Sequence, residues 1–138
     1  MKEILLSIGV IAGALALSGA AVFVARDGAT FVPPPEAAAE EFTRELSQKR
    51  YAIAWRHMSS AARQRDSEAQ LRARFEPVLA ELGKINHVEA DEVASSGDTA
   101  TATSSIDGSR HDVVLTLALR RENGLWMVEQ WEVGGRVE

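Results

Sequence analysis

The chain has 138 residues and a formal net charge of −5, a balance that argues against general attraction to nucleic acid. It contains no cysteine, which excludes disulfide bonds, zinc sites built on thiolates and lipid attachment to an N-terminal cysteine. The part that follows the first apolar segment has the size of one small domain.

The N-terminal region is an apolar run from Ile4 to Ala25 that contains neither a charge nor a proline. A helix rises about 1.5 Å per residue, so this run is long enough to cross a hydrocarbon core about 30 Å thick. Three interpretations compete: an uncleaved signal anchor, a secretory signal cleaved near Ser18–Ala20, and a buried core helix. Its length favours the anchor, and the lack of a polar face disfavours a core helix. We expect a transmembrane signal anchor over residues 1–27.

Charges beside the run give a weak signal for orientation. Lys2 precedes the run, whereas Arg26 and Asp27 follow it. Because so few residues come first, we expect the N-terminus to stay in the cytoplasm. This orientation predicts a single-pass protein of the inner membrane whose C-terminal domain lies on the periplasmic, or extracytoplasmic, side.

Residues 28–35 are expected to form a linker, since consecutive prolines at 33–35 favour an extended, stiff conformation. One domain then covers residues 36–138. Its first part shows the apolar spacing of three helices. They begin near Glu36, at Tyr51 and after Ser67, where Gln70 completes a capping box.

The period changes from helix to strand after Gly83. Four strands are expected, over Ile85–Val93, Thr99–Ile106, Val113–Leu119 and Leu125–Val133. Turn signals such as Asn123-Gly124 make them an antiparallel meander. Alternation in the last strand places Trp126 toward the helices and Trp131 on the opposite, outer face. The pattern predicts an α+β fold, with three helices packed on a curved four-stranded antiparallel sheet.

Several short patterns also resemble a known superfamily. They are Phe42, Leu46, Tyr51, Ala54-Trp55 and Met58-Ser59, then Leu82–Ile85, then Arg121–Val128. Together they resemble the nuclear-transport-factor-like, or ketosteroid-isomerase-like, cone fold, and especially small bacterial membrane-anchored domains of unknown function. The resemblance implies a pocket between helices and sheet. Its motifs concern packing and turns rather than chemistry, so it transfers almost no function.

The candidate lining of such a pocket is Tyr51, Trp55 and Trp126. Tyr51 is the best single candidate for an acid or base, although its place on an apolar helix face favours a packing role with the hydroxyl at the edge. The row of His87, Glu89 and Asp91 on one strand face suits either a metal or the solvated face of an edge strand. No motif indicates nucleophilic catalysis. We therefore expect no catalytic residue, no cofactor and no metal.

A second set of candidates would contact a partner or lipid headgroups. The stretch from Lys49 to Arg74 is strongly basic, whereas residues 75–109 are acidic. A solvated helix surface is the alternative interpretation of the basic stretch. Trp131 joins the set as an aromatic expected on the outer sheet face. The candidates are Arg50, Arg56, Arg63, Arg65, Arg72 and Trp131.

Two functions follow from these features. The first is a membrane-tethered, non-catalytic binding or accessory module of an envelope or membrane-protein complex, with a homodimer through the sheet face as a further option. The second is a small-molecule-binding or isomerase-like enzyme that uses the cone pocket. An interior filled by Phe42, Trp55, Phe75 and Trp126 would argue against the second function.

Overall fold

The computed structural model describes residues 23–24 and 30–137. The chain divides into two units at Pro33. In the first unit, strands β2 (Phe23–Val24) and β3 (Thr30–Phe31) form a short antiparallel pair. The expected membrane span lies outside the described residues except at Phe23 and Val24, which are extended rather than helical. Within the described ranges, no helix is both long and apolar enough to cross a membrane.

The second unit begins with four helices, one more than the sequence pattern predicted. They are α1 (Pro35–Ser47), α2 (Tyr51–Arg56), α3 (Ser60–Arg65) and α4 (Glu68–Leu82). The additional helix is α3, which the expected set of three helices did not include. A six-residue helix such as α3 is too short to show a clear apolar period.

The break between α2 and α3 has a specific cause. Met58 forms a bridge with Val128 of the last strand, which fixes this part of the backbone in an extended conformation. The Ser59 side chain then accepts a hydrogen bond from the Ala62 N–H at 3.1 Å and caps α3. Extension and capping at adjacent residues end one helix and start the next.

The capping box predicted for α4 is confirmed. The Ser67 hydroxyl accepts from the Gln70 N–H at 3.2 Å, and the Gln70 side chain accepts from the Ser67 N–H at 2.7 Å. Pro77 lies within α4, which is assigned as one helix to Leu82. Gly83 follows with φ of +80°, a conformation that favours glycine.

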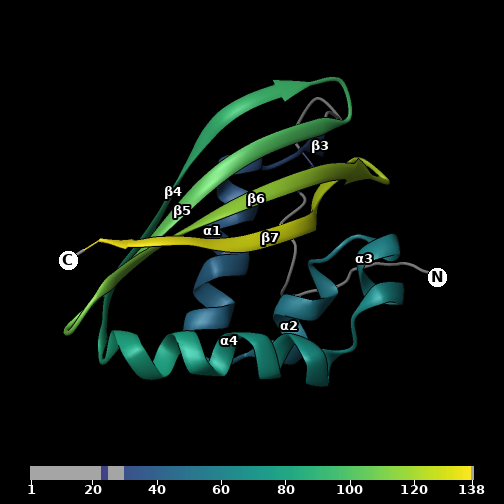
Figure 1. The fold of residues 1–138 in the computed structure, drawn as a ribbon. Helices are drawn as coiled ribbons and strands as arrows, with labels where there is room; N and C mark the ends of the chain where they lie inside the picture. The colour runs from purple at the N-terminus through teal and green to yellow at the C-terminus, as the bar shows by residue number, and fades with distance from the viewer. Residues whose placement is uncertain (1–22, 25–29, 138) are drawn as a thin grey trace. The chain divides into compact units, whose positions relative to one another are not determined.

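The sheet is an antiparallel meander in the order β4-β5-β6-β7, as the strand pattern predicted. The strands are β4 (Ile85–Ser96), β5 (Thr99–Gly108), β6 (Asp112–Glu122) and β7 (Leu125–Val137). They curve over α1, and α4 lies on the other side of α1 from the curved strands (Figure 1). Strands β4 and β7 are therefore the two edges of one sheet.

A β-bulge at Glu129 changes the face of the residues that follow it. Leu119 pairs with Val128, whereas Ala118 pairs with Gln130, so Glu129 is the extra residue. The bulge turns Trp131 to the same face as Val128, where it is 5% exposed. The expectation that Trp131 lies on the outer face was wrong, because simple alternation assumes an unbroken ladder.

Candidate functional site

The interior between helices and sheet is filled by aromatic side chains. The ring of Trp131 lies 6.5 Å from that of Phe42 and 5.8 Å from that of Phe75, centroid to centroid. Phe42 and Phe75 are fully buried. These contacts are part of the hydrophobic core between the helices and the sheet.

Tyr51 lies in this interior with its ring buried. Its hydroxyl donates a hydrogen bond to Glu76 at 3.2 Å, and the Arg72 guanidinium lies 5.2 Å from the ring centroid. Burial, together with the neighbouring Glu76 carboxylate, raises the pKa of Tyr51 to about 12. The hydroxyl therefore keeps its proton at neutral pH and acts as a donor to an internal partner.

The other two candidate pocket residues are also held by internal contacts. The Trp55 indole N–H donates to the Asp66 carbonyl at 2.8 Å, and Arg63 lies 5.7 Å from its ring. Trp126 is buried, as the alternation predicted, with the Arg121 guanidinium 4.8 Å from its ring. Neither tryptophan lines either of the two recesses described below.

The candidate arginines differ in how far the fold uses them. Arg63 and Arg72 stack on Trp55 and Tyr51, as described above. Arg65 donates to the Glu129 carbonyl at 2.7 Å and lies 3.5 Å from its carboxylate. Arg50 and Arg56, on either end of α2, are exposed. Much of the basic stretch therefore stabilises the domain itself.

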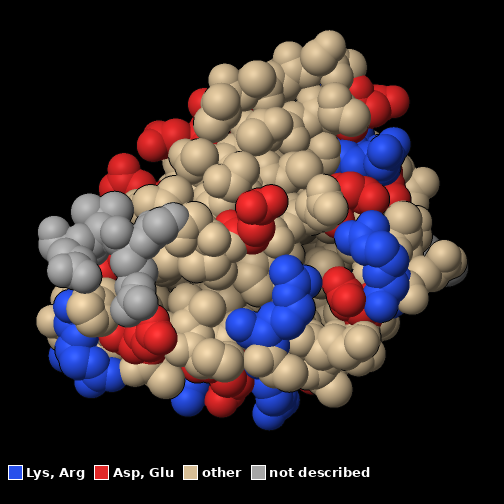
Figure 2. Space-filling model, in the orientation of Figure 1, with Lys and Arg blue, Asp and Glu red and all other residues tan. Residues whose placement is uncertain are grey.

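The first recess, called here the β7 recess, has a volume of about 350 Å³ and lies where α3 and α4 meet β7. It is lined by Met58, Arg65, Asp66, Arg74 and residues 130–132. Basic and acidic side chains are interspersed over this face (Figure 2). Arg74 lies 3.6 Å from the Asp66 carboxylate and 4.2 Å from the Trp131 ring centroid, so ion pairs and stacking surround the recess.

Glu129 ties this side of the sheet to the helices. Its carboxylate accepts a hydrogen bond from the Ser59 hydroxyl at 2.6 Å and lies 3.4 Å from Arg120. The Ser59 hydrogen bond first, and then the charges of Arg120 and Arg65, lower the pKa of Glu129. The carboxylate is therefore ionised throughout the neutral range and holds the start of α3 against β7.

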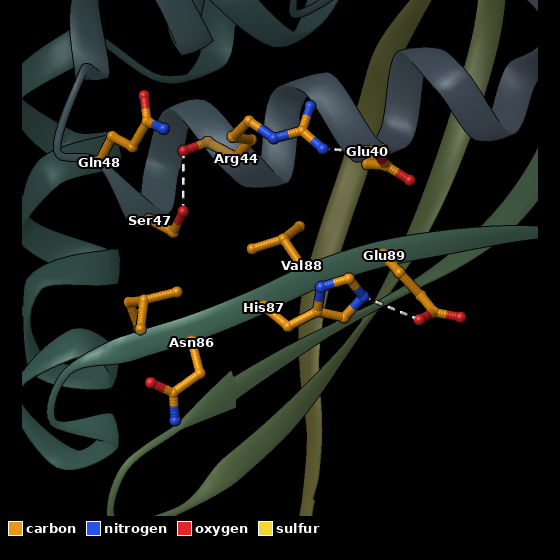
Figure 3. A pocket seen from close by; sticks show the side chains of 9 residues that line it. Glu40, Arg44, Ser47, Gln48, Asn86, His87, Val88 and Glu89 are labelled. Carbon is orange, nitrogen blue, oxygen red and sulfur yellow. Dashed lines mark hydrogen bonds and ion pairs between the residues drawn. The ribbon is translucent and has the colours of Figure 1, made fainter.

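The second recess, called here the β4 recess, is larger, about 630 Å³, and lies between α1 and β4. Its walls are Glu40, Arg44, Ser47 and Gln48 of α1 and residues 85–89 of β4. Val88 points from β4 toward α1, while His87 and Glu89 form a separate pair (Figure 3). The recess thus has an apolar floor, polar walls and an open side.

This recess borders a strand edge that carries very little protection. No other strand pairs with the outer side of β4 within the part of the chain that the structure describes. One carboxylate oxygen of Glu40 accepts from the Ala90 N–H at 3.3 Å, and the other accepts from Arg44 at 2.5 Å. Among the described residues, a single weak side-chain contact therefore covers an edge of twelve residues.

The row of His87, Glu89 and Asp91 lies on the solvated face of β4. All three are exposed, and His87 and Glu89 approach within 3.0 Å. No group of three potential metal ligands gathers anywhere in the described ranges. The exposed-strand interpretation of this row therefore has the better support.

One buried acid lies away from both recesses, on α1. Glu45 is 7% exposed and contacts the side chain of Glu41, one turn earlier. Burial and the Glu41 carboxylate raise the pKa of Glu45 to about 7, against the opposing charges of Arg50 and Arg44. Burial likewise lowers the pKa of nearby His57, which stays neutral.

Sequence reasoning missed the β4 recess entirely. The signals were present: Glu40 and Arg44 have the four-residue spacing of an ion pair on a helix, and the strand from Ile85 onward carries acidic side chains and no lysine or arginine. Nothing in those patterns states that helix and strand lie side by side.

In comparisons with known proteins, the chain matches no protein-family profile and no curated protein.

Proposed function

We propose that this chain is a non-catalytic protein-binding module that is held at the inner membrane and serves as an accessory subunit of a membrane or envelope complex. The single observation that carries the proposal is the open edge of β4 beside the β4 recess. An unpaired strand next to a groove offers backbone hydrogen bonds and side-chain pockets to a protein segment. Such a site needs no reacting group.

The tether in this proposal is the apolar run near the N-terminus. Because Phe23 and Val24 are extended, the helical span would cover residues 4–22. At about 1.5 Å per residue that length gives about 28 Å, close to the thickness of a hydrocarbon core. The domain from residue 34 onward would then lie on the extracytoplasmic side, with exposed Arg50 and Arg56 available to lipid headgroups or to the partner.

The isomerase-like alternative has less support. The aromatic side chains of Phe42, Phe75 and Trp131 occupy the interior, and the Tyr51 hydroxyl is held by Glu76. A substrate would have to displace these contacts before it met any acid or base. The cone-fold resemblance remains a prediction, and it does not favour an enzyme over a binding module.

The test is the native size of the tagged full chain after extraction from its own membranes in mild detergent. The proposal predicts migration far above the mass of the chain, and loss of that large species when residues 4–22 are replaced by a cleavable signal. Migration at the mass of one chain would contradict it. Migration at twice that mass would instead indicate a homodimer.

A further inference from the structure

The outward-facing groups of β4 can be identified from one contact. The Ala90 N–H donates to Glu40, so Ala90 faces away from β5. In an antiparallel strand, the N–H and C=O of one residue point to the same side, and this side alternates along the strand. Val88 and Glu92 therefore also present their N–H and C=O outward. These three residues form one regular, hydrogen-bonding edge, called here the β4 edge.

The position of the β4 recess fits an added strand. Side chains of such a strand would alternate between the two faces of the sheet. Those on the inner side would enter the recess over Val88, against Arg44 and Gln48 of α1. Those on the outer side would lie beside Glu89 and Asp91. The recess and the edge are thus two parts of one site for an extended peptide.

The charge of this region selects the occupant. Neither β4 nor β5 contains a lysine or an arginine. Glu89, Asp91 and Glu92 are the acidic residues of β4, and the acidic side chains in Figure 2 follow the upper left rim, where β4 lies in Figure 1. The nearby Arg44 is already paired with Glu40. Opposite charges on neighbouring strands attract and like charges repel, so the occupant is cationic.

A second copy of the chain is a poor occupant for the same reason. Two β4 edges would bring their acidic side chains together. A register shift at Val93, which is 61% exposed, also ends the regular part of the edge after Glu92 and prevents a long flat contact. A short segment of another protein meets neither obstacle.

We propose that the β4 edge binds a short, extended, cationic segment of a partner protein as an added strand, with its inner side chains in the β4 recess. On binding, backbone carbonyl oxygens of the segment replace the Glu40 carboxylate as acceptor for the Ala90 N–H, and basic side chains pair with Glu89 and Asp91. This inference rests on the proposed function, because it names the mode and chemistry of the partner contact.

The direct test uses the full chain in detergent micelles and a fluorescein-labelled decapeptide in which lysine and valine alternate. Fluorescence anisotropy is expected to rise with this peptide and not with its glutamate–valine counterpart. Hydrogen exchange at Val88 and Ala90 is expected to slow only with the lysine peptide. Equal binding of both peptides, or protection confined to other elements, would overturn the proposal.

Two variants separate the backbone contact from charge. Glu92→Pro removes an outward N–H together with a carboxylate, whereas Glu92→Ala removes the carboxylate alone; a proline is compatible with an edge strand at such a position. The lysine peptide is expected to bind Glu92→Pro at least about fivefold more weakly than Glu92→Ala, the effect of one lost hydrogen bond. Equal affinities would overturn the added-strand mode.

The same variants distinguish this inference from the proposed function. If the extracted wild-type chain migrates in a large complex and Glu92→Pro leaves that complex intact, the β4 edge is not the contact, while the accessory role stands. If the wild-type chain migrates alone, the accessory role itself fails. Loss of the large complex in Glu92→Pro but not in Glu92→Ala supports both.

Discussion

The two edges of the sheet, β4 and β7, differ in how many backbone groups the described residues cover with hydrogen bonds. At β7, the Val128 N–H donates to the His57 carbonyl and its carbonyl accepts from the Ser59 N–H, each at 2.8 Å. Glu129 is then bound by Ser59 and Arg65. At β4, a single carboxylate contact to Ala90 at 3.3 Å is the protection that the described residues provide.

Within the described part of the chain, the helix side of the domain covers β7 and leaves most of the backbone edge of β4 uncovered. A free edge exposes unpaired N–H and C=O groups and invites association, so domains cover or disrupt such edges. At β7, the segment between α2 and α3 covers the edge through the hydrogen bonds of His57 and Ser59 with Val128. At β4, a bulge and a row of acids restrict association without covering the backbone. Of the two edges, β7 has its backbone groups covered by neighbouring residues, whereas β4 is limited by its bulge and its acidic side chains.

Trp131→Ala should have the largest effect on stability. Trp131 joins β7 to Phe42 and Phe75 in the core, so its loss leaves a cavity and should cost about 3–5 kcal/mol of the free energy of unfolding. Denaturant unfolding measures this value. Met127→Ala, a change on the partly exposed neighbour, is the control. A loss below about 1 kcal/mol for Trp131→Ala would mean that the ring lies on the outer face.

Glu45→Gln should change the pH dependence of stability. The raised pKa means that the folded state holds a proton that the unfolded state releases, so this stabilisation is complete below pH 4.5 and is lost as the pH rises to about 7. The amide cannot ionise. The variant should therefore match wild type at pH 4 and exceed it at pH 8 by on the order of 1–3 kcal/mol.

Thermal or denaturant unfolding across this pH range checks the prediction, with Glu68→Gln, at a partly exposed position of α4, as the comparison variant that should change the profile less. Lower stability of Glu45→Gln than of wild type at pH 8 would show that Arg50 and Arg44 stabilise a charged Glu45 in the folded state. The prediction would then have the wrong sign.

Ser59→Ala should weaken the closed edge by a smaller amount. It removes the cap of α3 and the donor to Glu129, which together should cost about 1–2 kcal/mol. Because the pKa of Glu129 is lowered in the folded state, that part of the stability exists above the ordinary value of 4.5 and is lost as the pH falls. The loss in Ser59→Ala should therefore shrink in acid.

Ser60→Ala, at the next position in the chain, is the matched control, because the Ser60 hydroxyl donates an exposed hydrogen bond to Glu122. It should change the free energy of unfolding by less than about 0.5 kcal/mol. Equal losses in the two variants, or a Ser59→Ala loss that is constant from pH 3 to pH 7, would separate Ser59 from the Glu129 contact.

Glu40→Ala should have the smallest effect on stability, below about 0.5 kcal/mol, because the pair with Arg44 is half-exposed. Its expected effect is local: hydrogen exchange of the Ala90 amide should accelerate while that of Val128 stays unchanged. Glu41→Ala, which also removes a carboxylate near Arg44, is the control. Unchanged exchange at Ala90 would mean that Glu40 does not cover the β4 edge.

Much of the fold could be read from local patterns. The alternating strand after Asp112, the Asn123-Gly124 turn and the Ser67 capping box are each defined by neighbours in the sequence, and the structure contains all three. The bulge at Glu129 could not be predicted in the same way, because a single extra residue leaves no periodic signal.

That one residue also accounts for the wrong expectation about Trp131. Simple alternation assigned its ring to the outer face, whereas the bulge places it in the core beside Phe42 and Phe75. The β4 recess was missed for a different reason. It depends on where α1 crosses β4, a tertiary relation between residues 40–48 and 85–89 that neither segment encodes alone.

The most direct test of the open edge is residue-resolved hydrogen exchange of the full chain, purified alone and in the complex extracted from its own membranes. The account predicts that the Val88 and Glu92 amides exchange rapidly in the isolated chain and slowly in the complex, while Val128 is protected in both. Unchanged exchange at these two amides, with new protection on the outer sheet face or on α4, would contradict it.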